Sequence, residues 1–277
     1  MSRVLVTGGT GTVGQAVVRR LLRDPDFEVR MSDRHEAPDW MREGASVHTG
    51  DLRDVGEARR AVHGCSHVIH LAAAGPFTSF EVDHAVFRAA IDEGVDRFTY
   101  VSSSLVYENA EEFPTPEEHV PPPRSALGWA KLAGEVHCRA AHDGFGLRFA
   151  ICRPFDADEV PDLIAGSLVA RKPLTIRGTG EQTRTVTHVD DLADGIVAAT
   201  AHPGGLNEHF NIAAREERTV AEIARICWEA AGNDPADLEL EHVPDDEVVQ
   251  RQWPSVDKAE RLLGWRATRG IEWLAAR

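Results

Sequence analysis

An apolar strand that runs directly into a glycine-spaced turn and then into an amphipathic helix is the feature that most constrains this chain. Residues 4–18 read VLVTGGTGTVGQAVV. Gly8 permits a tight turn, Gly11 lets the backbone approach a pyrophosphate, and Gly14 lets the helix pack closely on the strand. The first turn of the helix presents N–H groups and a partial positive charge to phosphates. The stretch therefore predicts a dinucleotide site, to which Thr10, Thr12 and Val13 of the same turn also belong.

Glycine spacing alone also fits an ordinary strand-to-helix turn, but a second signal follows it. Residues 28–33, EVRMSD, read as a strand that ends in Asp33, about twenty residues after the glycines. A carboxylate there accepts hydrogen bonds from the adenosine ribose hydroxyls and repels a 2′-phosphate. Arg34 partly offsets that repulsion. The sequence therefore predicts NAD as the cofactor, with NADP less favoured.

Strands and helices alternate through the first half of the chain. A third strand over 45–52 ends in Asp51 and Leu52, which we expect at the adenine edge, and a buried strand over 67–74 ends in small residues that leave room for a flat ligand. Further expected elements are a helix over 82–93, a strand over 97–102, a helix over 127–141 and a strand over 147–154. Such alternation predicts an α/β fold, a Rossmann doubly wound parallel sheet whose ligands bind at the carboxyl ends of the strands.

The domain organisation follows from where this alternation ends. We expect a dinucleotide-binding domain over 1–155 and a smaller C-terminal substrate-binding lobe formed mainly by 156–277. Residues 188–212 are expected to return a helix and a strand to the larger domain.

Composition excludes several classes of function. A formal net charge of −15 disfavours nonspecific binding to nucleic acids or anionic membranes. No apolar run reaches the length of a membrane span, and the first strand begins within a few residues of Met1, so we expect a cytoplasmic protein. The four cysteines are widely separated and lack metal-ligand spacing, which predicts free thiols and no metal site.

Several motifs, taken in order, resemble the extended short-chain dehydrogenase/reductase superfamily, specifically its NAD-dependent epimerase/dehydratase family, which acts largely on nucleotide sugars. The resemblance covers nearly the whole chain. The matching stretches are 7–14 (TGGTGTVG), 50–52 (GDL), 70–73 (HLAA), 102–107 (SSSLVY), 131–135 (KLAGE), 153–154 (RP), 173–180 (PLTIRGTG), 187–191 (THVDD), 210–212 (FNI) and 257–265 (DKAERLLGW).

The resemblance implies site residues. In this family a serine or threonine, a tyrosine and a lysine perform proton transfer while hydride passes to or from nicotinamide, and the lysine also holds the ribose. Ser103 matches the serine and Lys131 the lysine, but the position four residues before Lys131 is Leu127, where the tyrosine is expected. The implied cofactor contacts further include Leu71, Ala72, Ala73 and Pro154.

Leucine cannot transfer a proton, so three explanations remain open. Another group supplies the proton, with Tyr107, Lys131 and Glu108 as candidates. Alternatively, water or the substrate moves the proton. In the third explanation, redox chemistry is lost, and the protein is a catalytically silent dinucleotide-binding sensor or accessory partner. We favour a modified enzyme, because the lysine and the second lobe are retained.

Other departures from the family pattern concern the substrate. Asp83 stands where an asparagine is common, and an acidic loop over 243–247 replaces an arginine that contacts a sugar-nucleotide diphosphate. Arg184 and Arg251 are the candidate substitutes, beside Ser103, Ser104 and Tyr107 as further substrate contacts. A nucleotide sugar is the leading substrate class and a smaller sugar or polyol the alternative. The family also implies a homodimer.

Overall fold

A seven-stranded, wholly parallel sheet forms the centre of the protein. The structure, a computed structural model, describes all of residues 1–277 except 74, 76, 156–163, 166–172, 246–248 and 272–277. The strand order is β10-β6-β5-β4-β1-β2-β3. Its strands are β1 (Ser2–Thr7), β2 (Phe27–Asp33), β3 (Ser46–Thr49), β4 (His67–His70), β5 (Arg97–Val101), β6 (Phe149–Pro154) and β10 (Glu208–Ile212).

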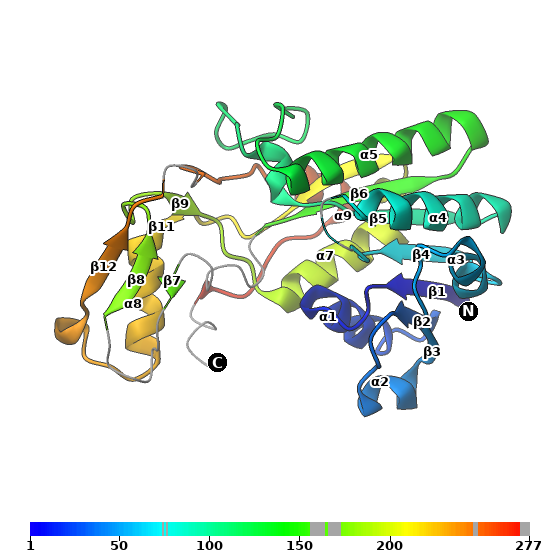
Figure 1. Ribbon diagram of the computed structural model, residues 1–277, viewed down its shortest axis with the longest axis horizontal. Coiled ribbons are helices and arrows are strands. Elements are labelled where there is room, and N and C mark those ends of the chain that lie inside the picture. Colours follow the sequence, from blue (N-terminus) through cyan, green and yellow to red (C-terminus); the bar gives the residue numbers. More distant parts are fainter. Residues whose placement is uncertain (74, 76, 156–163, 166–172, 246–248, 272–277) are drawn as a thin grey trace.

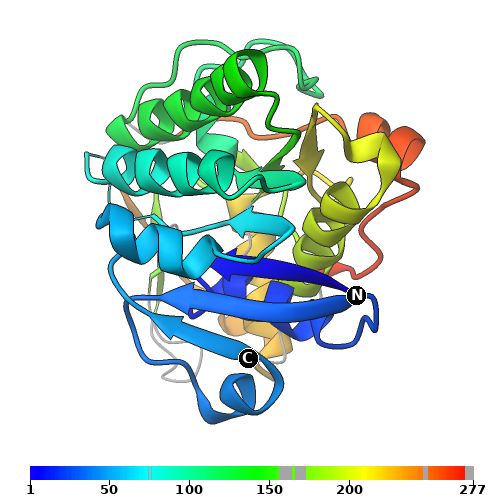
Figure 2. The same ribbon diagram turned by 90° about the vertical axis from the view of Figure 1, so that its right-hand side faces the viewer.

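Helices cover both faces of this sheet, as Figures 1 and 2 show. One apolar core joins the sheet to α1 (Thr12–Leu21) and α7 (Val189–Ala201), and a second joins it to α3 (Val55–Val62), α4 (Ser79–Asp92) and α5 (Ala126–Phe145). Both faces of the strands are therefore buried, which explains their nearly continuous apolar sequences. The predicted α/β Rossmann class is confirmed.

Local signals explain where the helices begin. Asp54 caps α3 by accepting from the Glu57 N–H, and Ser125 caps α5 by accepting from the Gly128 N–H. By contrast, α1 begins after Gly11 with no side-chain cap. The short helix α2 (Asp39–Gly44) and the 3-10 turn η1 (Ser104–Tyr107) were not predicted. The strand expected over 67–74 ends at His70, and the helix expected from 82 begins at Ser79.

Strand β10 and helix α7, from the second half of the chain, lie against the first half. Residues 208–212 pair in parallel with residues 150–154 of β6, and α7 packs against α1. Arg20 on α1 donates to Asp194 on α7 at 2.8 Å. Helix α9 (Asp257–Leu263) contacts both β10 and α7.

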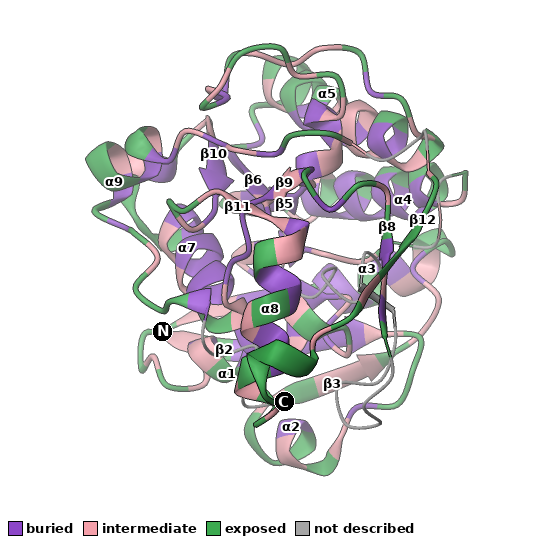
Figure 3. Cartoon of the chain, turned by 90° about the vertical axis from the view of Figure 1, so that its left-hand side faces the viewer, coloured by how far each residue is buried: buried purple, intermediate pink, exposed green. Residues whose placement is uncertain are grey.

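A smaller lobe lies beyond the carboxyl ends of the sheet (Figures 1 and 3). Helix α8 (Val220–Ala230) begins with a capping box between Thr219 and Glu222 and packs on a three-stranded sheet of order β12-β8-β7. The remaining elements of this lobe are β7 (Ile164–Ala165), β8 (Leu174–Arg177), β9 (Thr183–Arg184), β11 (Arg218–Thr219), β12 (Leu240–Val243) and η3 (Pro235–Asp237), while η2 (Pro203–Gly205) follows α7. Among the described residues, no helix has the length and apolar character needed to cross a membrane.

Candidate functional site

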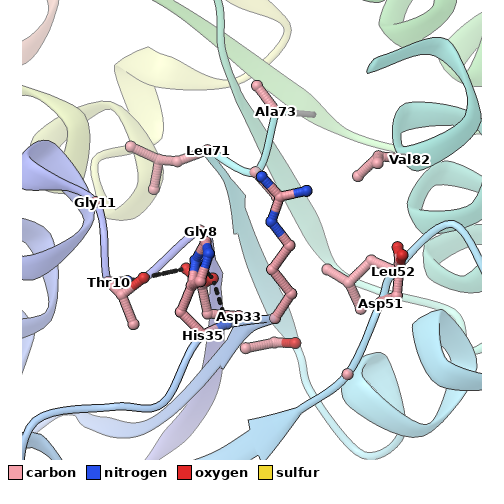
Figure 4. Close-up of a pocket in the computed structure, with 14 residues that line it drawn as sticks. Gly8, Thr10, Gly11, Asp33, His35, Asp51, Leu52, Leu71, Ala73 and Val82 are labelled. Atoms are coloured by element: carbon pink, nitrogen blue, oxygen red, sulfur yellow. Dashed lines mark hydrogen bonds and ion pairs between the residues drawn. The ribbon is translucent and has the colours of Figure 1, made fainter. Parts of the chain in front are cut away.

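A cavity of about 270 Å³ opens at the carboxyl ends of the central strands, between the neighbouring strands β1 and β4, where the strand order reverses. In Figure 4 the glycine turn forms one wall, and Asp51, Leu52 and Val82 form the other. The cavity brings together ten of the predicted cofactor residues: Gly8, Thr10, Gly11, Asp33, Arg34, Asp51, Leu52, Leu71, Ala72 and Ala73. This is where doubly wound sheets bind their ligands.

The three glycines of the turn have different surroundings. A Cβ on Gly14 would lie 2.1 Å from the Gly8 carbonyl oxygen, so this helix can pass the strand only with glycine there. Gly8 has a φ of +69°, and a Cβ on it would lie 2.8 Å from the Ala72 nitrogen. At Gly11 the nearest atom to a Cβ is 3.5 Å away, an ordinary contact. The fold therefore requires glycine at 8 and 14, whereas at 11 the exposed backbone leaves room for a ligand.

Thr12, Val13 and Gly14 form the first turn of α1. This turn is uncapped by any side chain, and Thr12 is exposed. Backbone N–H groups at such a helix start are suited to phosphate oxygens. The residues present thus fit the pyrophosphate of a dinucleotide.

Asp33 ends β2 beside this turn. Its carboxylate accepts from the Thr10 N–H at 3.1 Å, the Thr10 hydroxyl at 2.7 Å and the His35 N–H at 3.1 Å. Burial raises the pKa of Asp33, but these hydrogen bonds outweigh it and leave the pKa below its usual value. An ionised carboxylate is therefore fixed at the rim of the cavity, next to the exposed Arg34.

Asp51 and Leu52 lie on the opposite side of the cavity (Figure 4). Asp51 pairs with Arg53, whose hydrogen bonds lower the pKa of Asp51 to about 2, and Leu52 is buried. Ser32, His35, Gly50 and Val82 also line the cavity and were missed from the sequence. Ser32 and Gly50 directly precede the two predicted acids, Asp33 and Asp51. Their position at strand ends could therefore have indicated that they line the cavity.

Lys131 lies on α5, one helical turn after Leu127, and extends toward the end of β5. Its Nζ donates to the Val101 carbonyl oxygen at 2.9 Å and lies 5.4 Å from the centre of the Tyr100 ring. Burial lowers the pKa of Lys131, while the carboxylates of Asp83 and Glu135 oppose that shift. Lys131, Pro154, Thr12, Val13 and Gly14 are not among the residues that line the 270 Å³ cavity.

The serines of the motif SSSLVY differ in exposure. Ser103 is half-buried and its hydroxyl accepts from the Leu105 N–H at 3.2 Å, capping η1. Ser104 is only 2% exposed. Of the two, Ser103 is the better placed to meet a ligand.

Two proposed substitutes for the absent tyrosine have other roles. Tyr107 is buried, donates to Asn211 Oδ1 at 2.8 Å and accepts from Arg153. Burial raises the pKa of its hydroxyl. The Glu108 carboxylate accepts from the N–H groups of Arg124 and Ser125, both at 2.7 Å. The buried hydroxyl of Tyr107 thus has two partners within the protein, which favours a structural role over the expected substrate contact or proton exchange.

The two arginines suggested for a diphosphate are also engaged within the protein. Arg184 is buried, and its guanidinium donates to the carbonyl oxygens of Thr183 and Val249. Arg251 pairs with Glu217 through bonds of 2.7 and 2.8 Å and lies over the rings of Phe113 and Trp253. Arg251 is exposed, so it meets a ligand only by exchanging Glu217 for it.

The remaining candidate reactive groups are metal-ligating clusters and cysteine thiols. Within the described part of the chain, no group of three or more histidine, cysteine or acidic side chains is arranged to hold a metal ion. All four cysteines are free thiols and are buried.

Comparison with known proteins identifies the family of this chain. The model of the NAD dependent epimerase/dehydratase family matches residues 4–213. The chain is 30% identical over 236 residues to the uncharacterized protein y4nG of Sinorhizobium fredii, covering 80% of this chain and 59% of that protein, so it spans well under two thirds of this relative.

Two solved structures match over nearly the full length of both chains. The Thermotoga maritima UDP-glucose 4-epimerase with UDP-glucose has a TM-score of 0.86 and 25% identity, covering 99% of this chain and 96% of that one. DesIV, the dTDP-glucose 4,6-dehydratase of Streptomyces venezuelae with NAD and TYD bound, has the same TM-score, identity and coverage.

Proposed function

The chain belongs to the NAD-dependent epimerase/dehydratase family, and from this membership we propose that it is an NAD-dependent oxidoreductase of atypical active site, acting on a nucleotide sugar or a related sugar or polyol. The observation that carries the proposal is the cavity in which Gly8 and Gly11, of the glycine turn that leads into α1, lie across from Asp51 and Leu52, with the ionised Asp33 beside the turn. When bound there, a nicotinamide dinucleotide supplies hydride transfer.

The residues of this chain divide the remaining work. Gly8, Gly11 and the first turn of α1 bind phosphates, and Asp33 binds the adenosine ribose and disfavours a 2′-phosphate. Lys131 holds the nicotinamide ribose, and Ser103 hydrogen-bonds the reacting oxygen. Because Tyr107 and Glu108 are engaged elsewhere, Lys131 is the remaining ionisable candidate for proton exchange.

The engaged arginines bear on the substrate. Binding a diphosphate at Arg251 requires breaking the bidentate pair between Arg251 and Glu217, which costs free energy. A neutral sugar or polyol can bind without breaking this pair. Relatives of this fold with bound UDP-glucose and TYD support a nucleotide sugar. Both classes therefore belong in the assay.

The test begins with the purified protein. Denaturation and chromatography identify any released nicotinamide cofactor, and absorbance at about 340 nm is followed while the intact protein receives nucleotide sugars, free sugars and polyols. A redox change that disappears in Lys131→Met supports the enzyme. Product analysis by NMR covers epimerisation, in which no net redox change accumulates.

Leu127 favours a second candidate function, a catalytically silent dinucleotide-binding protein. Such a protein binds NAD but converts none of the substrates, and Leu127→Tyr does not produce activity in it. In the enzyme, Ser103→Ala lowers turnover, whereas in the silent protein it changes affinity at most.

We further propose a homodimer formed through α4 and α5. These neighbouring helices expose Phe80, Trp129 and Val136, which are 46%, 49% and 58% exposed. Large apolar side chains gathered on adjoining helices are suited to burial against a second copy.

A further inference from the structure

Four buried polar side chains form a continuous hydrogen-bonded chain beneath the cofactor cavity. Thr7 ends β1, His70 ends β4, Asp83 lies on α4 and Tyr100 on β5; each is at most 3% exposed. The bonds are 2.7 Å from Thr7 Oγ1 to His70 Nδ1, 3.0 Å from His70 Nε2 to Asp83 Oδ1, and 3.0 Å from the Tyr100 hydroxyl to Asp83 Oδ2.

One assignment of protons satisfies all of these groups. The Thr7 oxygen accepts from the Ala72 N–H; with the tautomer of His70 that carries its proton on Nε2, the Thr7 hydroxyl donates to His70 Nδ1 and His70 Nε2 donates to Asp83. Tyr100 donates to the second oxygen of the same carboxylate. In this arrangement both oxygens of the Asp83 carboxylate accept a hydrogen bond, in the buried layer between α4, α5 and the sheet.

Helix α5, which carries Lys131, passes over the Asp83 carboxylate. A Cβ on Gly134 would lie 2.8 Å from Asp83 Oδ2 and 2.0 Å from the Tyr100 hydroxyl, so the helix passes directly over the carboxylate. Gly134 follows Lys131 by three residues and therefore shares its face of the helix. The Lys131 ammonium lies over the ring of Tyr100, whose hydroxyl binds Asp83.

The other groups around Lys131 do not replace Asp83. Glu135 is held by Arg153 through two bonds of 2.8 and 2.7 Å, and both side chains are buried, so its charge is already matched. Burial raises the pKa of the Cys138 thiol and lowers that of His137, which leaves both neutral near pH 7. Asp83, by contrast, lies under α5 and accepts from the hydroxyl of Tyr100, over whose ring the Lys131 ammonium lies.

We propose that Asp83 is a positioning residue whose buried carboxylate keeps Lys131 protonated and in place at the end of β5. Asp83 touches neither cofactor nor substrate in this role, because it acts through Lys131. The importance of the charge for binding rests on the proposed function of Lys131. The proposed effect of Asp83 on the protonation of Lys131 does not depend on that function.

The chain contains three lysines, Lys131, Lys172 and Lys258, which makes a direct titration practical. Protein labelled with lysine carrying ¹³C at Cε gives one NMR signal for each, and Lys131→Met identifies the signal of interest. We expect the titration midpoint of Lys131 to fall by about one pH unit or more in Asp83→Asn, because an opposite buried charge is removed. Tyr100→Phe is the matched control, since it removes a hydrogen bond of Asp83 but keeps the carboxylate, and it should shift the midpoint far less.

The inference is overturned if the Lys131 midpoint in Asp83→Asn matches that of the unmodified protein. Asp83→Ser removes the same charge with a smaller side chain and carries the same expectation, so the test does not depend on one variant folding. The signal of Lys258 and the circular dichroism spectrum report on folding. NAD affinity at pH 7 and pH 9 is measured separately: a shifted Lys131 with unchanged affinity would contradict the proposed ribose role of Lys131 and leave the charge pairing intact.

Discussion

Gly11 and Gly14 lie in one turn but meet different constraints, and a pair of alanine variants separates them. Gly14→Ala forces a methyl group onto the Gly8 carbonyl, where overpacking costs about 2 kcal/mol and lowers the Tm by roughly 4–8 °C. Gly11→Ala fits the fold, so its Tm should stay close to that of the parent, while its NAD affinity falls because the methyl group occupies the path of the pyrophosphate. Thermal unfolding and calorimetric titration measure the two effects. A large loss of Tm in Gly11→Ala would contradict this division.

Asp33 is expected to determine the choice between NAD and NADP. Replacing it with serine removes the charge that repels a 2′-phosphate and leaves the exposed Arg34 beside the site. We expect the ratio of NADP to NAD affinity to rise by about tenfold or more, since one repulsion of this size is worth roughly 1.4 kcal/mol. Asp24→Ser, distant from the cavity, serves as the control. An unchanged ratio would remove Asp33 from cofactor selection.

Individual site residues could be predicted from the sequence where the spacing between them is enough to indicate their role. The interval from Gly8 to Asp33 predicted residues that the structure brings into one cavity. The burial of Tyr107 was not predicted, because whether a tyrosine faces a cleft or the core depends here on contacts with Asn211 and Arg153, which are 104 and 46 residues away. Nothing near Tyr107 in the sequence encodes those contacts.

At the scale of elements, the hydrogen bonds of Tyr107 link η1 to β10 and β6. We therefore expect Tyr107→Phe to lower the stability of the fold. Loss of its hydroxyl leaves the buried Asn211 and Arg153 each without one partner, and the free energy of unfolding should fall by about 1–3 kcal/mol. Urea unfolding measures this loss. Cofactor affinity and any turnover should stay within a few-fold of the parent; a loss of turnover with unchanged stability would return Tyr107 to the list of catalytic candidates.

Strand β10 carries a pH-dependent contribution to stability. Burial, with Lys258 and Arg153 nearby, lowers the pKa of His209 to about 4, and its Nδ1 has no hydrogen-bond partner among the described residues. Neutral His209 therefore stabilises the fold fully above about pH 6.5, and this contribution, roughly 1–2 kcal/mol, is lost as the pH falls toward 4, because only the unfolded chain takes up the proton.

His209→Gln should flatten this dependence. Its urea midpoint should change less between pH 7 and pH 4.5 than that of the parent, while His242→Gln, at an exposed position, should keep the parental slope. Equal slopes for all three proteins would show that His209 titrates normally in the fold.

The elements themselves were mostly predictable, and their ends were not. Periodicity placed β1, α1, β2, β5, α5 and β6 close to their observed ranges, because buried parallel strands and amphipathic helices have distinct patterns. The strand ending at His70 was drawn too long, since the small residues after it are apolar like a strand but line the cavity instead. The placement of α5 over Asp83 followed from no local signal.

For the whole molecule, the fold is better determined than the reaction. Relatives of the same architecture include an epimerase and a dehydratase, so the fold alone does not select between those reactions. The net charge of −15 also places the burden of anion binding on local groups, of which Arg184 and Arg251 are already engaged. An anionic substrate would therefore need either other groups or the exchange of Glu217 for the substrate at Arg251.

The proposed homodimer gives a prediction at the same scale. Trp129→Glu combined with Val136→Glu places two carboxylates in the apolar surface of α5, and burying them against a second copy costs several kcal/mol. Light scattering after gel filtration should therefore show a dimer for the parent and a monomer for the variant, each with the same circular dichroism spectrum. Val55→Glu is the control, because Val55 is 55% exposed but lies on α3, outside the two helices of the proposed contact. A parent that remains monomeric at every concentration, or a variant that stays dimeric, would show that these exposed side chains do not form the subunit interface.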